Sequence, residues 1–369
     1  MRIEKIETIP VVIPLTRVFG GSKYSVPTRA TVVTRIHTEG GLVSEVYNGD
    51  DRSGGPEICK IIQEELAPLI LGEDAMAVER IWAKMFTIAH LIRDRARVME
   101  AIACVDTALW DLVGKALGTS VAKLFGGYRD RMPIISIGGY YEDGVTLDDY
   151  RKEMETLKGL GLAGVKFKVG GLTLDEDFAR VEAARDGAGA EFLIAIDANR
   201  GWATADAVRF ARRVEPLDIL WFEEPCHWYD DYPGNAEVRR ATSIPVASGQ
   251  SEISGHGVKR LIAAGGIDFC NIDASHCGGP TEWRRIAGLC ALHGVRMAMH
   301  EEGHLSMHLL SGIPHGTFVE CFADPDRDPV WQAMYGNRPA IEGGEIAVPQ
   351  APGFGIELDW DMVTKYRVD

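Results

Sequence analysis

The middle of the chain is organised as a series of short apolar runs separated by amphipathic stretches. The runs are centred near residues 136, 167, 195, 222, 247, 271, 298 and 319, at intervals of 21 to 31 residues. Between these runs, apolar residues recur three and four positions apart, which is typical of amphipathic helices. The helices are predicted over residues 147–159, 175–187, 204–214, 235–241, 257–264 and 281–293. Eight strands alternating with helices predict an α/β fold in which a parallel sheet closes into a barrel.

The first part of the chain has a different pattern, which predicts an α+β domain over residues 1–130. A long amphipathic helix is predicted to end at Gly118, where glycine favours termination. Shorter elements precede it, with strands expected over residues 5–13, 30–37 and 43–47 and helices over 56–69 and 75–86. We expect the barrel to occupy residues 131–325. The segment 326–369 is rich in Pro and Gly and is expected to return to the first domain and complete it.

Composition narrows the class of protein. The 369 residues are 46% hydrophobic and 25% charged, which is ordinary for a globular chain. The net charge of −15 and the lack of a basic cluster argue against nucleic acid as a partner, and no apolar run is long enough to span a membrane. The amino terminus shows no cleavage site, and the seven cysteines form no C-x-x-C pair. We therefore predict a cytoplasmic protein with reduced thiols.

Polar side chains gather where the predicted barrel strands end. The carboxyl ends of parallel strands form the active site in barrels of this type, and residues two apart on one strand share a face. One such residue could be a solvated charge at a loop boundary, but seven consecutive strands carry them at matching depth. The sequence therefore predicts a catalytic site from Lys166, Lys168, Asp197, Asn199, Glu223, Gln250, Asp273, His300 and Glu320.

A divalent metal is expected between two of these strands. Asp197 and Glu223 lie on neighbouring strands, and closely placed carboxylates repel unless a cation or protons lie between them. We expect Mg²⁺, with a hydrogen-bonded pair as the alternative. Lys166 and Lys168 point to the same interior, so each ammonium should make protonation of the other costlier. The metal adds further positive potential, so one lysine could be neutral and act as a base. Lys168 suits this role better than Lys166, for which pairing with a carboxylate is the alternative.

A second proton-handling group is predicted opposite the lysines. Asp273 and His300 occupy adjacent strands, where a carboxylate can orient an imidazole towards a substrate. Two bases on either side of a metal-bound carboxylate imply abstraction of the α-proton and an enediolate. Return of the proton to carbon gives a racemase or epimerase, and protonation of a β-hydroxyl gives a 2-keto acid. A protonated Glu320 could donate a hydrogen bond to the substrate carboxylate.

Several motifs together resemble the enolase superfamily and, within it, the mandelate racemase subgroup. They are CVDTALWDLVGKALGTSVAKLFGG, VKFKVG, IDANRGW, WFEEP, the glycine pair after Asp273, and the spacing of Asp273, His300 and Glu320. The resemblance covers essentially the whole chain. It implies a (β/α)7β modified TIM barrel, an N-terminal capping domain with a mobile loop, Mg²⁺ and a carboxylic acid substrate. It also implies that Lys168 is one base and that the Asp273–His300 dyad is the second base, with Lys166 modulating Lys168. A homo-oligomer is expected on the same ground.

The third metal ligand departs from this family pattern, which has a glutamate after glycine at the end of strand five. Here the segment reads ASGQSE, so Gln250 and Glu252 are both candidates. Substrate specificity is expected to come from the capping segment FGGSKYSVPTR. We predict that Lys23, Tyr24 and Arg29 contact the substrate together with Asn199, and Asn48, Asp50, Asp51 and Arg52 offer further groups for hydroxyls.

The favoured function is dehydration of an acid sugar (an aldonate or aldarate) to a 2-keto-3-deoxy acid. Racemisation or epimerisation of a 2-hydroxy acid on the same site is the alternative. Cycloisomerase and dipeptide epimerase branches fit less well, because they place lysine where this chain has Asp273. The motif HEEGH at residues 300–304 suggests a zinc peptidase, but that site needs both histidines on one helix, so we expect His304 and His308 to be packing residues. A barrel that only binds a ligand is a further alternative, motivated by Gln250.

Overall fold

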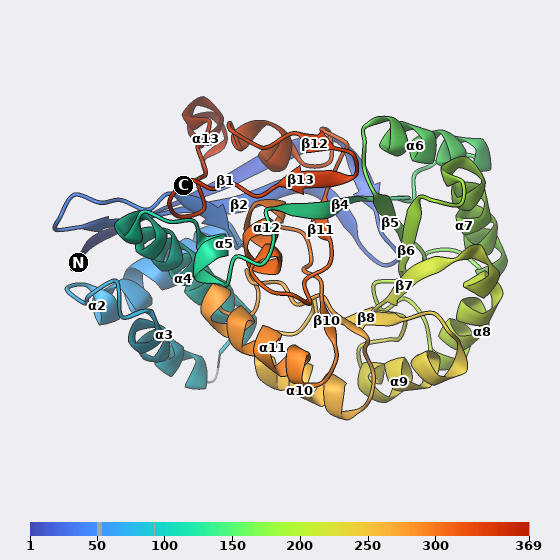
Figure 1. Ribbon diagram of the computed structural model, residues 1–369, viewed down its shortest axis with the longest axis horizontal. Coiled ribbons are helices and arrows are strands. Elements are labelled where there is room, and N and C mark those ends of the chain that lie inside the picture. Colours follow the sequence, from blue (N-terminus) through green and yellow to red (C-terminus); the bar gives the residue numbers. More distant parts are fainter. Residues whose placement is uncertain (50–53, 92, 369) are drawn as a thin grey trace.

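The computed structural model describes residues 1–49, 54–91 and 93–368. Its first part combines an antiparallel sheet with helices on one side (Figure 1). The strands are β1 (Ile3–Gly20), β2 (Ser25–Thr38) and β3 (Val46–Asn48). The helical elements are α1 (Gly55–Ile61), η1 (Ile62–Leu66), α2 (Ala67–Ile70), α3 (Val78–Phe86), η2 (Thr87–His90), α4 (Arg95–Leu117) and α5 (Val121–Leu124). The predicted α+β pattern is therefore present, although β1 and β2 are longer than predicted.

Helix α4 fixes this layer against the barrel. It begins after Asp94, whose side chain accepts hydrogen bonds from two backbone amides, and ends at Gly118 in the left-handed conformation, as predicted. Asp106 is fully buried on α4, and its carboxylate accepts hydrogen bonds from the backbone amide and the hydroxyl of Thr281, both at 2.8 Å. Burial raises the pKa of Asp106 to about 7, which the two bonds from Thr281 oppose.

The remainder of the chain contains a parallel barrel. Pairing runs continuously from β10 to β4, and β11 pairs with β4 and brings the last strand beside the first. Each predicted strand centre lies within an observed strand or one residue beyond it. The strands are β4 (Arg131–Gly138), β5 (Gly164–Lys168), β6 (Leu193–Asp197), β7 (Ile219–Glu223), β8 (Val246–Ser248), β9 (Phe269–Cys270), β10 (Arg296–Met297) and β11 (Val319–Cys321).

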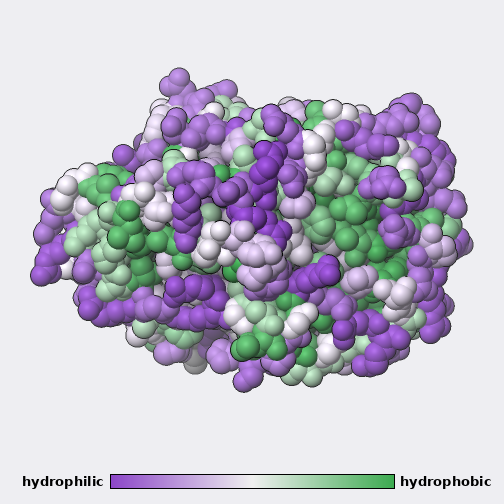
Figure 2. Space-filling view, in the orientation of Figure 1, coloured by the Kyte–Doolittle hydropathy of each residue, from purple (hydrophilic) through white to green (hydrophobic). Residues whose placement is uncertain are grey.

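The helices surround this barrel on its outer side (Figure 1). Six of them lie within a few residues of the predicted ranges: α6 (Leu147–Gly159), α7 (Leu174–Ala188), α8 (Thr204–Val214), α9 (Asp231–Ala241), α10 (Gly255–Ala263) and α11 (Pro280–Leu292). Figure 2 shows polar residues along the outer edge of the molecule over α7 and α8, as amphipathic helices require. Helix α12 (Gly303–Ser311) was not predicted, because all its residues are buried and no polar face marks it.

The segment after β11 contacts both parts of the molecule. It forms η4 (Val330–Met334), β12 (Ile341–Glu342), β13 (Glu345–Ala347) and α13 (Trp360–Tyr366). Strand β13 pairs with β4, whereas Arg367 forms a bridge to Val11 on β1. The predicted domain limits at residues 130 and 325 stay a prediction. The seven cysteines are all free thiols, as expected. Among the described residues, no helix is long and apolar enough to cross a membrane.

The tip of the β1–β2 hairpin lies over the strand ends of the barrel. Ser22 donates a hydrogen bond of 2.8 Å to the carbonyl of Ala198, which follows β6. The amide of Tyr141, after β4, donates to the carbonyl of Gly20 at 2.8 Å. The first part of the chain therefore covers the end of the barrel where the polar side chains gather.

The Asp106–Thr281 contact should contribute measurably to stability. We predict that Asp106→Ala lowers the free energy of unfolding by about 1–3 kcal/mol, because the buried donors of Thr281 lose their acceptor. Urea unfolding followed by circular dichroism measures the change. Asp148→Ala, which removes an exposed carboxylate on α6, is the control and should cause a much smaller loss. Equal losses in the two variants would contradict the assignment.

Candidate active site

Three neighbouring strands end with charged residues in the same register. Lys168 on β5 pairs with Asp197 on β6, and Asp197 pairs with Glu223 on β7. In-register residues on adjacent strands lie about 5 Å apart and point to one face. None of the three side chains is more than 3% exposed. The strand geometry therefore brings a base candidate and two metal-ligand candidates into one buried cluster.

The two lysines join the carboxylates into a continuous network. Lys166 Nζ lies 2.8 Å from Glu223 Oε1, 2.8 Å from Glu320 and 4.0 Å from Asp197 Oδ2. Lys168 Nζ lies 2.7 Å from the same Asp197 oxygen. Glu320 also accepts a hydrogen bond from the backbone amide of Glu301 at 3.0 Å. In this arrangement Glu320 accepts hydrogen bonds, and its expected role as a donor to substrate stays a prediction.

The carboxylates control the protonation of both lysines. Burial alone would lower the pKa of Lys166, but Glu223 and Glu320 raise it above its ordinary value. Burial would also lower the pKa of Lys168, but the nearby Asp197 carboxylate outweighs this effect and holds that pKa well above the usual range. In this arrangement the neighbouring carboxylates outweigh lysine–lysine repulsion, and the prediction that one lysine is neutral and acts as a base, made for a site that also holds a metal ion, stays a prediction. Burial raises the pKa of Glu223 to about 8.

The predicted histidine dyad is formed at the ends of the next strands. His300 Nδ1 lies 3.1 Å from Asp273 Oδ2, and Asp273 Oδ1 accepts a hydrogen bond of 2.7 Å from the amide of Ser275. Burial opposes protonation of His300, but Glu301 and Asp273 raise its pKa above the ordinary value. The other ring nitrogen, Nε2, lies 3.5 Å from Glu301 Oε1. Glu301 is the second residue of the HEEGH motif, and this contact was not predicted from the sequence.

Gln250 belongs to a buried polar network beside Glu223. Its Nε2 donates to Glu224 Oε2 at 2.9 Å, and its Oε1 accepts from Asn271 Nδ2 at 3.3 Å. Ser251 also donates to Glu224, at 2.8 Å. Glu224 is 3% exposed and was not singled out from the sequence, although the doubled glutamate of WFEEP is a signal that could have identified it. This network fixes the Gln250 amide through Glu224, the residue that follows Glu223 in the chain, and Asn271.

Glu252 is placed differently from Gln250. Its carboxylate accepts a hydrogen bond of 2.7 Å from the hydroxyl of Tyr232 on α9. It also lies against Gly257 at the start of α10, where an added Cβ would collide with it. The structure therefore does not bring Glu252 together with Asp197 and Glu223, and Gln250 is left as the candidate third ligand.

The predicted specificity residues occupy three different environments. Lys23 is exposed, and the ring of Tyr24 lies 5.8 Å from Lys168 Nζ. Arg29 is buried, and its guanidinium lies 3.2 to 3.7 Å from the carboxylates of Glu301, Glu302 and Asp328. Its contacts are with protein carboxylates, which the sequence did not predict.

Asn199 and Asn48 lie on two other segments named as substrate candidates. The amide of Asn199 donates to Asp197 Oδ1 at 2.8 Å, while its own side-chain Oδ1 is buried without a hydrogen-bond partner. Asn48 is fully buried and donates to the hydroxyls of Thr107 and Ser275. The other candidates of that segment, Asp50, Asp51 and Arg52, lie outside the described residues.

The HEEGH motif does not form a peptidase zinc site. His300 precedes α12, whereas His304 lies in its first turn. His304 Nε2 is 2.7 Å from the carbonyl oxygen of Tyr47, and the two rings are stacked. Burial lowers the pKa of His304 to about 3 and that of His308 to about 4, so both are neutral. The prediction that they are packing residues is confirmed.

Backbone strain is concentrated around these strand ends. Six non-glycine residues among those described have positive φ, and five of them lie in the loops after β6, β7 and β10: Asn199, Arg200, Glu224, Glu301 and Glu302. Such conformations cost about 1–3 kcal/mol each and persist where surrounding contacts fix them. The side chains of the network above provide those contacts.

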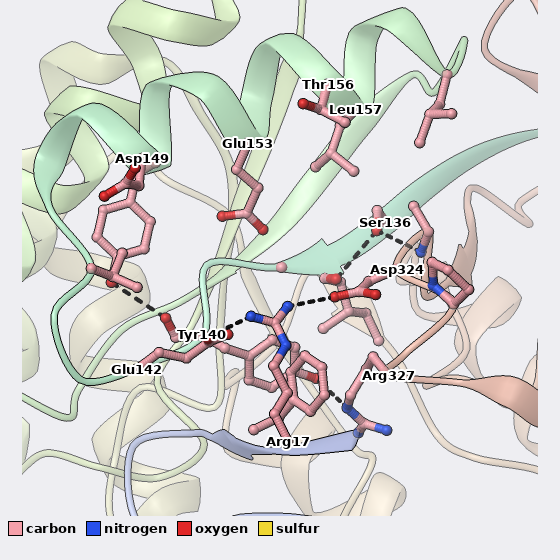
Figure 3. Close-up of a pocket in the computed structure, with 18 residues that line it drawn as sticks. Arg17, Ser136, Tyr140, Glu142, Asp149, Glu153, Thr156, Leu157, Asp324 and Arg327 are labelled. Atoms are coloured by element: carbon pink, nitrogen blue, oxygen red, sulfur yellow. Dashed lines mark hydrogen bonds and ion pairs between the residues drawn. The ribbon is translucent and has the colours of Figure 1, made fainter. Parts of the chain in front are cut away.

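A cavity of about 420 Å³ lies beside the site, between α6 and the end of β4 (Figure 3). Arg17 crosses it and pairs with Glu142 at 2.6 Å and Asp324 at 2.7 Å. Tyr140 and Arg327 form one wall and are joined by a hydrogen bond of 3.1 Å. The described residues that line the cavity include none of the predicted catalytic side chains. It is therefore a separate feature from the cluster at the strand ends.

Two family models match the chain. Residues 6–126 match the mandelate racemase/muconate lactonizing enzyme N-terminal domain, and residues 149–362 match the enolase C-terminal domain-like model. Among curated relatives, the 3,6-anhydro-alpha-L-galactonate cycloisomerase of Streptomyces coelicolor is 30% identical, over 99% of each chain. The L-talarate/galactarate dehydratase of Salmonella typhimurium is 29% identical, over 96% of this chain and 89% of that protein.

A solved structure agrees over the whole molecule. A mandelate racemase/muconate lactonizing enzyme from a marine actinobacterium, in complex with magnesium, is 47% identical to this chain. It superposes with a TM-score of 0.93 and covers 100% of this chain and 99% of its own. The matches confirm the predicted fold class and the predicted resemblance. The chain belongs to the mandelate racemase/muconate lactonizing enzyme family of the enolase superfamily.

Proposed function

We propose that this protein is a magnesium-dependent lyase that dehydrates an acid sugar to a 2-keto-3-deoxy acid. The observation that carries the proposal is the buried cluster in which Lys168 and the Asp273–His300 dyad accompany the carboxylates of Asp197 and Glu223. Its curated relatives include a dehydratase of aldaric acids. Proton-transfer groups beside a metal site suit abstraction of a proton next to a carboxylate.

The residues at the end of β6, β7 and β8 fit a magnesium ion. Asp197, Glu223 and Gln250 would hold it through oxygen atoms, which are the donors that Mg²⁺ prefers. The buried Oδ1 of Asn199 has no hydrogen-bond partner and is a further oxygen beside Asp197. When bound, the cation supplies positive charge that offsets these carboxylates and stabilises the enediolate of the substrate.

The remaining steps depend on the side chains of the chain itself. Lys168 is proposed to take the α-proton, and Lys166 to keep the neighbouring Glu223 and Glu320 oriented through its two contacts of 2.8 Å. His300, held by Asp273, is proposed to donate a proton to the leaving β-hydroxyl. Tyr24 and Lys23 on the covering hairpin are proposed to select the substrate.

An isomerase is the second candidate function. The whole-chain match to a cycloisomerase favours an isomerase in general, although the chain has Asp273 where that branch places lysine. In a racemase or epimerase the same first step is followed by return of the proton to carbon. A cytoplasmic location and a homo-oligomer are also part of the proposal, as is a small carboxylate substrate rather than nucleic acid.

The reaction can be tested with a panel of aldonic and aldaric acids. We predict that the Mg²⁺-loaded protein forms a 2-keto acid from at least one of them, detected with semicarbazide. Lys168→Ala should lower kcat by at least about 100-fold, because a general base is lost. Lys152→Ala, on the exposed face of α6, is the control and should retain turnover. Epimer formation without keto acid would favour the isomerase, and normal turnover by Lys168→Ala would contradict both.

The identity of the third ligand can be tested through metal affinity. We predict that Gln250→Glu tightens Mg²⁺ binding by about tenfold or more, because a third carboxylate adds charge attraction of at least ~1.4 kcal/mol. Isothermal titration calorimetry measures the change. Glu252→Gln is the control and should leave the dissociation constant unchanged, since Glu252 is bonded to Tyr232. Weaker binding in Glu252→Gln together with no change in Gln250→Glu would reverse the assignment.

A further inference from the structure

Asp273 lies between two imidazole rings, only one of which belongs to the proposed dyad. Its Oδ2 is 3.1 Å from His300 Nδ1 and 3.9 Å from His276 Nδ1. The two rings have a centroid separation of 6.1 Å. One ligand atom from each of the three residues can be chosen so that all three lie within 4.8 Å of one another. The proposed function does not use His276.

The donor set of this cluster differs from that of the proposed magnesium site. Two imidazole nitrogens and one carboxylate oxygen suit Zn²⁺, Co²⁺ or Ni²⁺, whereas Mg²⁺ prefers oxygen donors. The ends of β6, β7 and β8 offer oxygen donors from Asp197, Glu223 and Gln250. The chain therefore presents two sets of metal-ligating groups that select different classes of divalent ion.

The geometry is close to that of a bound ion. Ligands at 2.0–2.1 Å from a tetrahedral zinc are roughly 3.3 Å apart, so the Asp273–His300 separation of 3.1 Å already fits. His276 lies 3.9 Å from Asp273 and has a ligand nitrogen within 4.8 Å of one on His300, so it must approach the pair by at most roughly 1.5 Å. The side chain of His276 is 23% exposed, whereas that of Asp273 is 2% exposed and is fixed by the amide of Ser275. The outer ligand can therefore turn towards a fixed inner pair.

Groups around the cluster would support a bound ion. Glu301 Oε1 lies 3.5 Å from His300 Nε2, the nitrogen that does not face Asp273. A carboxylate in this position orients a metal-binding imidazole and increases its basicity. The side chain of His276 is 23% exposed, so solvent reaches the cluster and water can supply a fourth ligand.

We propose that Asp273, His276 and His300 form a second metal site, for Zn²⁺ and related transition-metal ions, that is distinct from the magnesium site. Binding transfers the Nδ1 proton of His300 to solvent and places the metal between Asp273 and the ring. An occupied site therefore lacks the acid/base dyad, and zinc inhibits the enzyme. Only this inhibition rests on the proposed function, since metal binding itself requires no turnover.

Cobalt is the probe that separates the two sites, because its visible absorption reports the number and type of ligands. The full-length protein is saturated with Mg²⁺ and titrated with Co²⁺, and bound metal is counted after equilibrium dialysis. We expect one Co²⁺ per chain with a strong visible band. His276→Phe keeps a planar ring without a donor, and His276→Gln keeps a polar side chain. Both should weaken Co²⁺ binding by at least about tenfold.

Two controls make the result specific. His293→Asn removes an exposed histidine just after α11 and should bind Co²⁺ as the parent does. Asp197→Asn alters the magnesium site and should also retain the visible band. Circular dichroism confirms that each variant is folded. Parent-like Co²⁺ binding by both His276 variants, or loss of the band in Asp197→Asn alone, would overturn the proposal. A protein that binds Co²⁺ at His276 but turns over no acid sugar would retain this site and reject the proposed function.

Discussion

The structure depends on matching buried charges at the carboxyl end of the barrel. Asp197, Glu223 and Glu320 are at most 1% exposed, and isolated carboxylates in such an environment are strongly disfavoured. Lys166 and Lys168 provide the compensating charge at distances of 2.7 to 2.8 Å. The same ion pairs affect catalysis. They influence which lysine can give up its proton, and they mark the carboxylates that a metal cation could bind in place of an ammonium group. The charged atoms that must be paired for the protein to fold are therefore the same atoms that are proposed to carry out the reaction.

This constraint explains features outside the cluster. The loops that carry Asn199, Glu224 and Glu301 adopt left-handed conformations and are fixed by hydrogen bonds to the cluster or to its neighbours. The β1–β2 hairpin covers the strand ends through Ser22, and Asp106 ties the long helix α4 to the start of α11. These contacts come from segments far apart in the sequence, so the first part of the chain helps to hold the barrel end that it covers.

Much of this arrangement could be predicted from the sequence because it follows periodic patterns. The strands near residues 136 to 319 and six helices were readable from apolar spacing, and parallel pairing then places Lys168, Asp197 and Glu223 side by side. Helix α12 was not readable, since a helix buried on all sides has no polar face. The pKa values of the lysines could not be predicted either, because they depend on distances between side chains rather than on strand positions. The contacts of Arg29 and Glu252 could not be predicted for a similar reason, because their partners Asp328 and Tyr232 are distant in sequence or on another element.

The account requires that two groups handle protons on opposite faces of one bound substrate. The most direct measurement is exchange of the α-proton for deuterium in heavy water, followed by ¹H NMR. The substrates are the two C2 epimers of an acid sugar that the enzyme turns over. The account predicts that His300→Asn exchanges the α-proton of one epimer only, through Lys168, and that Lys168→Ala exchanges that of the other only, through His300. Exchange of the same epimer by both variants would contradict it, because the two residues would then act on one face.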